Sequence, residues 1–474
     1  MSAPAKGIGW KASREPLNGR AVQPPKILPT TDVANGERFA TDHGDVVRFC
    51  HKWGKWFTWT GRQWREDESG EVWRLAKDSA KRIYIEAAVA DDADCRAITN
   101  HATASQSRSR LLAMLDLAKS EHPIPIDHTA FDADGWLLNF NNVTVDLRDG
   151  SARPHDSGDL ITKTCGYDYP TESGDEPVLW LEFLTEIFAG DDKLIRYVQK
   201  LFGYALVGVV REHVLPIHHG SGSNGKSVLA STALAAFGDY GLAAPPGFLM
   251  DKRNDRHPTE LADLFGRRLV ILSESKDGQR LDEGLVKLVT GGDRLRARHL
   301  HQDFWEFSPS HTAMLLSNHL PVIKGVDVGV WRRVRKIPYE VTIPPKRQDD
   351  KLAEKLRAEL PVIAKWMVDG CLAWQKEKLT PPAKVLLATE GYKQDSDTFA
   401  QWFDERCLTG EQHEAKASAV FTDYKAWCER SNERPLTQTA FGLRVVEKPF
   451  TKERRRDGFW YFGFCLQASS YGEA

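Results

Sequence analysis

The sequence feature that most constrains this chain is the octapeptide GSGSNGKS at residues 220–227, which fits the pattern G-x-x-x-x-G-K-[ST]. The apolar run VLPIHHG before it predicts a short strand, and the alanine-rich stretch after it predicts a helix. In that setting, glycines let backbone N–H groups turn toward phosphate oxygens, and the start of the helix adds partial positive charge. The sequence therefore predicts a nucleotide phosphate site between a strand and a helix.

Two side chains of this loop have distinct expected roles. Lys226 is expected to reach the β and γ phosphates, and Ser227 is expected to bind Mg²⁺, so the predicted cofactors are ATP and Mg²⁺. An ordinary glycine loop is the alternative, and the strand and helix on either side disfavour it. The residues predicted to contact the nucleotide are Gly220, Ser221, Gly222, Ser223, Asn224, Gly225, Lys226 and Ser227.

Three later segments supply the groups that hydrolysis would need. RRLVILSES predicts an apolar strand that ends at Glu274, a candidate general base and metal contact, although Ser273 stands where a second acid is usual. TAMLLSN predicts a strand ending at Asn318, which is expected to face the γ phosphate. GVWRRVRKIPY offers Arg332 and Arg333 to stabilise developing phosphoryl charge. A helix cap, a strand-ending Asn and a solvated basic face are the respective alternatives.

The order of predicted elements indicates the fold class. A strand, a glycine loop, a helix and further buried strands predict an α/β core with a parallel sheet. Upstream, helical stretches and the aromatic hairpin WGKWFTWTGRQW predict an α+β domain, and downstream, three helical patterns before a basic hairpin predict a winged helix. The expected domains are a disordered tail (1–30), an α+β N-terminal domain (31–175), a helical collar (176–212), the core (213–345), a helical segment (346–385) and the winged helix (386–474).

Charge and hydropathy bound the possible partners. The 474 residues include 64 basic and 66 acidic side chains, so any contact with DNA must come from local basic clusters. TGGDRLRARHLHQDFWEF predicts a hairpin with cations near its tip, and a plain surface hairpin is the alternative. No apolar run approaches 18 residues and no leader-like segment begins the chain, so we expect a cytoplasmic protein without membrane contact. The predicted DNA-binding residues are Lys287, Arg296, Arg298, His299 and His301, with Arg294 beside them.

These motifs, in this order, resemble the superfamily 3 helicase core of phage and plasmid primase-helicases and the related poxvirus protein. GSGSNGKSVL, VILSES, LVKLVTGGDRLRARHLHQDFWEFSP, LLSNHLP and GVWRRVRKIP carry the resemblance over about 210–340. The resemblance implies an AAA+ domain, usually in a hexameric ring, with ATP held between subunits. By position, 220–227 resembles the Walker A loop, Glu274 the Walker B acid, Asn318 sensor 1, and Arg332 or Arg333 the arginine finger from a neighbour.

The resemblance also implies a function. It predicts an ATP-dependent DNA helicase that acts in replication of a phage, plasmid or satellite element and moves along single-stranded DNA as a ring. Forked DNA, a homo-oligomer and a separate primase or replication initiator are the implied partners. Primase activity is not implied, because the region before 210 offers only Asp146 and Asp149 in the turn-like DLRDG.

Two other classes stay open at this point. One is a P-loop kinase or small-molecule phosphotransferase that works as a monomer. The other is a DNA-binding regulator whose ATPase is a conformational switch, built round the winged helix with Arg444 and the basic run 452–456 as phosphate contacts.

Overall fold

The computed structural model describes residues 27–172, 174, 176–251, 259–273, 278–298, 303–323, 328–431, 433 and 435–467. The chain forms two compact units, Met1–Thr60 with Trp64–Ala130, and Gly61–Gln63 with Phe131–Ala474. The sequence predicted one N-terminal domain over 31–175, and the structure differs from that expectation. Leu138, Phe140 and Val145 pack in the core of the larger unit, because their strands bury apolar side chains against its helices.

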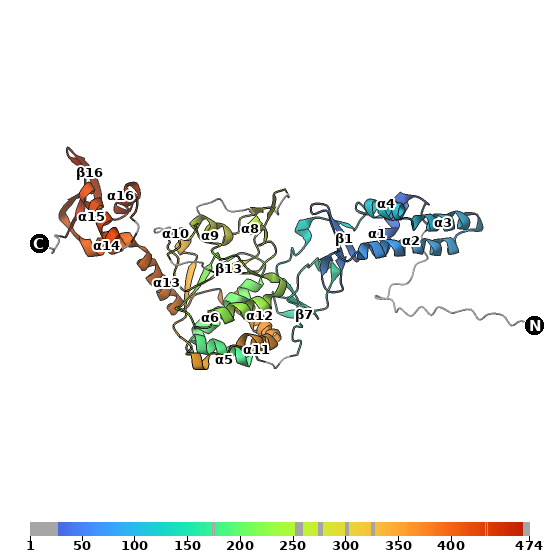
Figure 1. The fold of residues 1–474 in the computed structure, drawn as a ribbon, viewed down its shortest axis with the longest axis horizontal. Coiled ribbons are helices and arrows are strands. Elements are labelled where there is room, and N and C mark those ends of the chain that lie inside the picture. The colour runs from blue at the N-terminus through green and yellow to red at the C-terminus, as the bar shows by residue number, and fades with distance from the viewer. Residues whose placement is uncertain are drawn as a thin grey trace, which may run out of the picture. The chain divides into compact units, whose positions relative to one another are not determined.

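The described residues of the N-terminal unit combine the helices α1 to α4 with a small sheet (Figure 1). Its strands lie in the order β3-β2-β1-β4, and β2 pairs antiparallel with β3, so the predicted aromatic hairpin is confirmed. Phe39, Phe49, Leu111 and Met114 form its core. The elements are α1 (Asp32–His43), β1 (Val47–Cys50), β2 (Lys55–Trp59), β3 (Trp64–Glu66), α2 (Glu71–Val89), α3 (Asp92–Ser105), α4 (Arg108–Ala118) and β4 (Pro125–Ile126).

A buried ion pair fixes the first described residues of this unit. The Arg38 Nε lies 2.6 Å from the Glu86 Oε1, and the same guanidinium donates to the carbonyl oxygens of Leu28 (2.7 Å) and Pro29 (3.0 Å). The disordered tail predicted over 1–30 therefore extends too far, because Arg38 holds its last residues. Residues 1–26 of that tail lie outside the described residues.

The larger unit is built on a five-stranded sheet in the order β14-β8-β13-β10-β9. Every pairing in this sheet is parallel, which confirms the predicted α/β class with a parallel sheet. Apolar runs without alternation form these strands because both faces are covered. The strands are β8 (Leu215–His219), β9 (Gly241–Ala243), β10 (Leu269–Ser273), β13 (Thr312–Ser317) and β14 (Val334–Pro338).

Two hydrophobic clusters cover the two faces of this sheet. Leu269, Ile271 and Met314 point toward α5 (Val178–Ile187), α6 (Asp192–Leu206), α7 (Lys226–Phe237) and α12 (Leu360–Glu377). The alternate residues Val270 and Leu272 pack with α8 (Thr259–Ala262), α9 (Glu283–Val289) and α10 (Val328–Trp331).

The collar helix α6 packs closely on α12. A Cβ on Gly203 would collide with the backbone of Gly370 and Cys371, so the two helices can approach only through glycine at this crossing. The helical segment predicted over 346–385 is divided into α11 (Leu352–Ala358) and α12, with the break at Glu359. The Glu359 carboxylate accepts hydrogen bonds from the backbone N–H groups of Leu179 and Trp180, so the break caps the start of α5.

The C-terminal part of the larger unit has a hydrophobic cluster of its own, formed by residues such as Trp402, Tyr424, Phe441 and Phe464. The three predicted helical patterns and the terminal hairpin are present, and the strands lie in the antiparallel order β15-β17-β16. The elements are α13 (Ala383–Ser396), α14 (Thr398–Arg406), β15 (Cys407–Lys416), α15 (Ala417–Arg430), α16 (Gln438–Val446), β16 (Thr451–Arg455) and β17 (Gly458–Leu466).

The remaining short elements complete the larger unit. An antiparallel sheet contains β5 (Leu137–Asn139), β6 (Thr144–Asp146) and β7 (Ser151–Arg153), and a separate hairpin contains β11 (Leu295–Ala297) and β12 (Trp305–Phe307). Among the helices of the described residues, none has both the length and the apolar character needed to cross a bilayer.

Candidate functional site

The parallel sheet brings the predicted catalytic segments to one edge. Since all five strands run the same way, their carboxyl ends meet there, where α/β sheets bind ligands. The glycine loop follows β8, Asn318 follows β13 and Tyr339 follows β14. Ser273 ends β10 at the same edge, and Glu274, which comes next, lies outside the described residues.

The loop 220–227 has the backbone shape that a phosphate cradle needs. Gly222, Ser223 and Gly225 have φ values of 104°, 47° and 81°, which turn successive peptide units inward. The backbone N–H groups of 222–225 find no acceptor among the described residues. Gly225 must lack a side chain, because a Cβ there would lie 2.5 Å from the Ile187 Cγ2. The loop therefore offers donors to an anion and is held in place by packing.

Lys226 is buried at the first position of α7, and its ammonium lies within this loop. Its Nζ donates to the Gly220 carbonyl oxygen at 2.7 Å and to the Asn224 Oδ1 at 3.0 Å. Ser227 is exposed beside it, and its hydroxyl has no partner among the described residues. These are the two side chains that the motif assigns to the terminal phosphates and to a phosphate-bound metal.

A pocket of about 450 Å³ unites the loop with Asn318. Its polar lining is formed by 222–227 and Asn318, together with Glu186 and the charged and polar residues 347–350, and apolar lining comes from Phe183, Ile343 and Leu352. A volume of this size and a division into apolar and polar walls suit a nucleotide, with the base against the apolar wall. The residues present therefore fit ATP, and Ser227 supplies a hydroxyl that could bind Mg²⁺.

A buried tyrosine and histidine behind the loop were missed in the sequence. The Tyr339 hydroxyl forms a 2.9 Å hydrogen bond with the His218 Nδ1, and its ring centroid lies 5.8 Å from the Lys226 Nζ. Burial, with a smaller contribution from the Lys226 charge, lowers the pKa of His218 to about 3. His218 is therefore neutral at physiological pH, and Tyr339 presents an electron-rich face to the ammonium.

The two candidate arginines differ sharply in their surroundings. Arg333 is buried, and its guanidinium donates to the Thr290 Oγ1 at 3.0 Å and to the Gly329 carbonyl oxygen. Arg332 is exposed, and its side chain contacts no hydrogen-bonding or ionic partner among the described residues. Arg333 thus ties α10 to the end of α9, whereas Arg332 is available to another molecule.

The predicted cationic hairpin is present between the segments that carry the nucleotide site. β11 and β12 pair antiparallel, with Ala297 opposite Trp305, which confirms the hairpin. The guanidinium groups of Arg296 and Arg298 lie 4.7 and 4.9 Å from the ring centroid of Phe304, which is 40% exposed. Lys287 lies nearby in sequence, on α9, and His299 and His301 lie outside the described residues.

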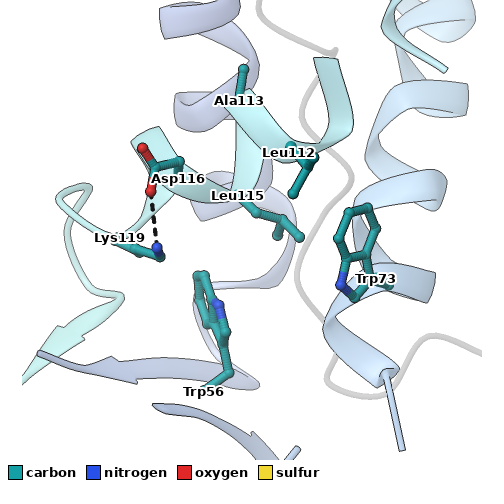
Figure 2. Close-up of a pocket in the computed structure, with 7 residues that line it drawn as sticks. All are labelled: Trp56, Trp73, Leu112, Ala113, Leu115, Asp116 and Lys119. Carbon is teal, nitrogen blue, oxygen red and sulfur yellow. Dashed lines mark hydrogen bonds and ion pairs between the residues drawn. The ribbon is translucent and has the colours of Figure 1, made fainter. Parts of the chain in front are cut away.

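A second pocket, of about 420 Å³, lies in the N-terminal unit (Figure 2). Figure 2 shows the indole rings of Trp56 and Trp73 on its walls with Leu115, and an ion pair of 2.9 Å between Asp116 and Lys119 at its rim. None of the residues predicted from the sequence lines this pocket.

The comparisons with known proteins bear on both units. Residues 36–189 match the family described as "D5 N terminal like", and residues 218–333 match a family of unknown function, DUF5906. A 294-residue stretch is 28% identical to "Putative helicase L207/L206" of Acanthamoeba polyphaga mimivirus, covering 58% of this chain and 31% of that protein. The chain is therefore similar to the D5-like primase-helicases of phages and viruses.

Other similar proteins show how much of a relative this chain represents. It is 25% identical over 477 residues to "Putative helicase 184R" of Invertebrate iridescent virus 6, covering 83% of this chain and 49% of that protein. The chain therefore spans less than half the length of these two D5-like relatives. Among solved structures, the apo C-terminal region of NrS-1 aligns with 91% of this chain and 99% of its own, at a TM-score of 0.49 and 11% identity.

Proposed function

We propose that this chain is an ATP-dependent DNA helicase that acts in replication of a phage, plasmid or satellite element. The observation that carries this proposal is the shared pocket of Lys226, Ser227 and Asn318, which lies at the carboxyl edge of a parallel sheet. Two D5-like relatives are named helicases, which supports the same activity. The proposed motor moves along single-stranded DNA as a homo-oligomeric ring, with a hexamer as the expected form.

The strand order supports an AAA+ core for this motor. β13, which leads to Asn318, lies between the loop strand β8 and β10, so a polar amide stands between the phosphate loop and the end of β10 at Ser273. We assign Asn318 to the sensing of the γ phosphate on this basis. The C-terminal helices with their antiparallel hairpin are assigned as a winged helix.

We assign the chemistry of hydrolysis to Lys226 and Ser227 of the pocket and to Glu274, which lies outside the described residues. Lys226 binds the β and γ phosphates, Ser227 and Glu274 hold Mg²⁺, and Glu274 takes the proton of the attacking water. Bound Mg²⁺ supplies charge neutralisation at the β and γ phosphate oxygens. Tyr339 and His218 place neutral side chains behind Lys226, whose ammonium faces the phosphates.

The exposed Arg332 is the better candidate for an arginine that acts on a neighbour's nucleotide. Arg333 already donates to Thr290 and to the Gly329 carbonyl within its own subunit, so moving it would remove these buried hydrogen bonds. The Arg332 side chain forms no hydrogen bond or ion pair of this kind with the described residues. We therefore assign Arg332 as the finger that reaches the adjacent subunit's ATP.

The β11–β12 hairpin is the proposed contact with the single strand. Arg296 and Arg298 lie on its exposed side, where guanidinium groups can bind successive phosphates with little sequence preference. Lys287, His299 and His301 remain further candidates for this contact. The hairpin follows β10 and precedes β13, so a change at the nucleotide could move it.

Stimulation of ATP hydrolysis by single-stranded DNA tests this proposal. Arg298→Ala should keep the basal rate of ATP hydrolysis, because the pocket is unchanged. Its stimulation by DNA should fall about tenfold, because a DNA contact is lost. Arg96→Ala, which removes an exposed arginine of α3 in the N-terminal unit, is the matched control and should behave as wild type. If DNA leaves the turnover of the purified protein unchanged, the proposal is wrong.

The alternatives predict different behaviour. A monomeric P-loop kinase would elute as a monomer with ATP in size-exclusion chromatography. A DNA-binding regulator with an ATPase switch would bind one duplex sequence and separate no strands. The cationic terminal hairpin favours the regulator over the kinase, since it offers a second surface for DNA. Whether a separate primase or initiator binds the chain would be tested by co-purification from cells that carry the element.

A further inference from the structure

The terminal hairpin β16–β17 gathers cations that the nucleotide site does not use. Its first strand and turn carry Lys452, Arg454, Arg455 and Arg456 with two acids, Glu453 and Asp457, and every residue of β16 is exposed. In the antiparallel register, Lys452 pairs with Tyr461 and Arg454 with Phe459, so these four side chains share one face. That face continues into the hydrophobic cluster through the buried Tyr461.

The opposite face of the same hairpin is neutralised. Arg455 forms a two-pronged ion pair with Glu414, at 3.0 and 2.6 Å, and the Lys416 Nζ lies 3.0 Å from the Asp457 Oδ2. Lys452, Arg454 and Arg456, in contrast, form no ion pair with any described residue. One side of this ribbon therefore keeps its positive charge, and the other does not.

Helix α16 borders the charged face without adding charge to it. A Cβ on Gly442 would lie 3.5 Å from the Tyr461 hydroxyl and 3.9 Å from the Lys452 Nζ, so the helix and the charged face adjoin. The α16 cation Arg444 is held by Asp397 and Glu447, each at 2.9 Å. The expectation that Arg444 contacts phosphate is therefore disfavoured, because two carboxylates already neutralise it.

We propose that the face of Lys452 and Arg454, with Arg456 at the turn, binds the phosphate backbone of double-stranded DNA. This surface deepens the proposed function, on which it rests for DNA as the partner. A two-stranded ribbon fits a groove of a duplex, and unpaired cations complement its phosphates.

Duplex binding by the full-length protein tests the proposal. The probe is a labelled 20-base-pair duplex of arbitrary sequence, measured by fluorescence anisotropy at several salt concentrations. The double variant Lys452→Gln with Arg454→Gln should bind roughly tenfold more weakly, and its log–log salt slope should be shallower by about 1.8, because each lost phosphate contact removes about 0.9. The Arg454 side chain packs on no ring among the described residues, and Arg454→Gln alone should make the salt slope shallower by about 0.9, which is half of the change expected for the double variant.

Arg455→Gln is the matched control on the same strand. It removes a neighbouring arginine from the paired face, so duplex affinity and salt slope should match the wild type. An equal loss in Arg455→Gln and Arg454→Gln would overturn the proposal, as would an unchanged slope in the double variant or a loss confined to single-stranded probes. Stimulation of ATP hydrolysis by single-stranded DNA should persist in all three variants, so its absence from the wild type would mark failure of the helicase proposal instead.

Discussion

Two hairpins of this protein hold cations over an exposed phenylalanine, and they differ in what lies behind them. In β11–β12, Arg296 and Arg298 lie over Phe304, whereas in β16–β17 Lys452 lies over Phe459. The buried side of the first hairpin packs in the cluster that includes β8, β10 and β13. The buried side of the second packs in a separate cluster of terminal aromatic residues.

This difference indicates which contact with DNA should respond to nucleotide. Leu295 and Phe307 of the first hairpin share a hydrophobic core with Leu272 of β10, one residue before Ser273 and two before Glu274. Packed cores transmit small displacements, so events at the phosphates can reach that hairpin. The terminal hairpin has no shared cluster with the sheet among the described residues. We expect it to bind DNA equally well in every nucleotide state.

The largest expected effect separates the two hairpins completely. Lys226→Ala should abolish ATP hydrolysis and unwinding, because the buried ammonium that binds the phosphates is lost. Duplex affinity through the terminal hairpin should stay at the wild-type value. Parallel ATPase and anisotropy measurements on one preparation check both expectations. A duplex affinity that fell together with turnover would break the distinction between the hairpins.

A smaller but still large effect should distinguish the adjacent arginines. Arg332→Ala should lower turnover by about 10³-fold and leave the unfolding temperature unchanged, since the side chain is exposed and acts on a neighbour's nucleotide. Arg333→Ala should lower the free energy of unfolding by about 1–3 kcal/mol, because Thr290 and the Gly329 carbonyl lose a buried donor. Turnover assays with thermal unfolding of both variants measure this. If Arg333→Ala lost turnover and Arg332→Ala lost stability, Arg333 would be the finger and Arg332 the structural residue.

The smallest expected effect is a pH dependence of the free energy of unfolding that comes from the sheet core and not from the terminal region. His218 has its pKa lowered from 6.5 to about 3 in the folded core. Between these two pKa values His218 is protonated in the unfolded chain and neutral in the folded chain. The free energy of unfolding therefore decreases as the pH falls, by about 1.4 kcal/mol per pH unit. The terminal region has no buried histidine among its described residues, where His413 is half-buried.

The variant His218→Asn measures that contribution. Urea unfolding at pH 6.5 and pH 5.0 should show a shallower loss of stability in this variant than in the wild type, while duplex binding by the terminal hairpin changes equally little in both. Identical pH dependence in wild type and variant would show that His218 does not titrate as its burial indicates.

Local patterns in the sequence were enough to predict several parts of the fold. The loop 220–227, the parallel strands and the β11–β12 hairpin each depend on short-range rules for turns, periodicity and glycine. The break at Glu359 was missed, because the helical pattern continues across it. The break places the Glu359 carboxylate at the start of α5, where it caps Leu179, and 180 residues separate these two residues in the sequence.

Other features of the site depend on contacts that the sequence does not display. Tyr339 meets His218 only because β14 pairs in parallel with β8, and 121 residues separate the two side chains. Arg332 and Arg333 are equivalent in sequence, and only tertiary packing buries one of them. The unpaired and paired faces of the terminal hairpin likewise follow from the partner strand that supplies Glu414.

The most direct test of the central claim is to mix subunits with different lesions. Lys226→Ala subunits cannot hydrolyse their own ATP but still present Arg332, whereas Arg332→Ala subunits hold ATP but present no finger. If ATP lies between subunits, random rings of equal mixture should regain turnover at about a quarter of their interfaces. Rings that visibly assemble from the mixture and remain inactive would contradict the account.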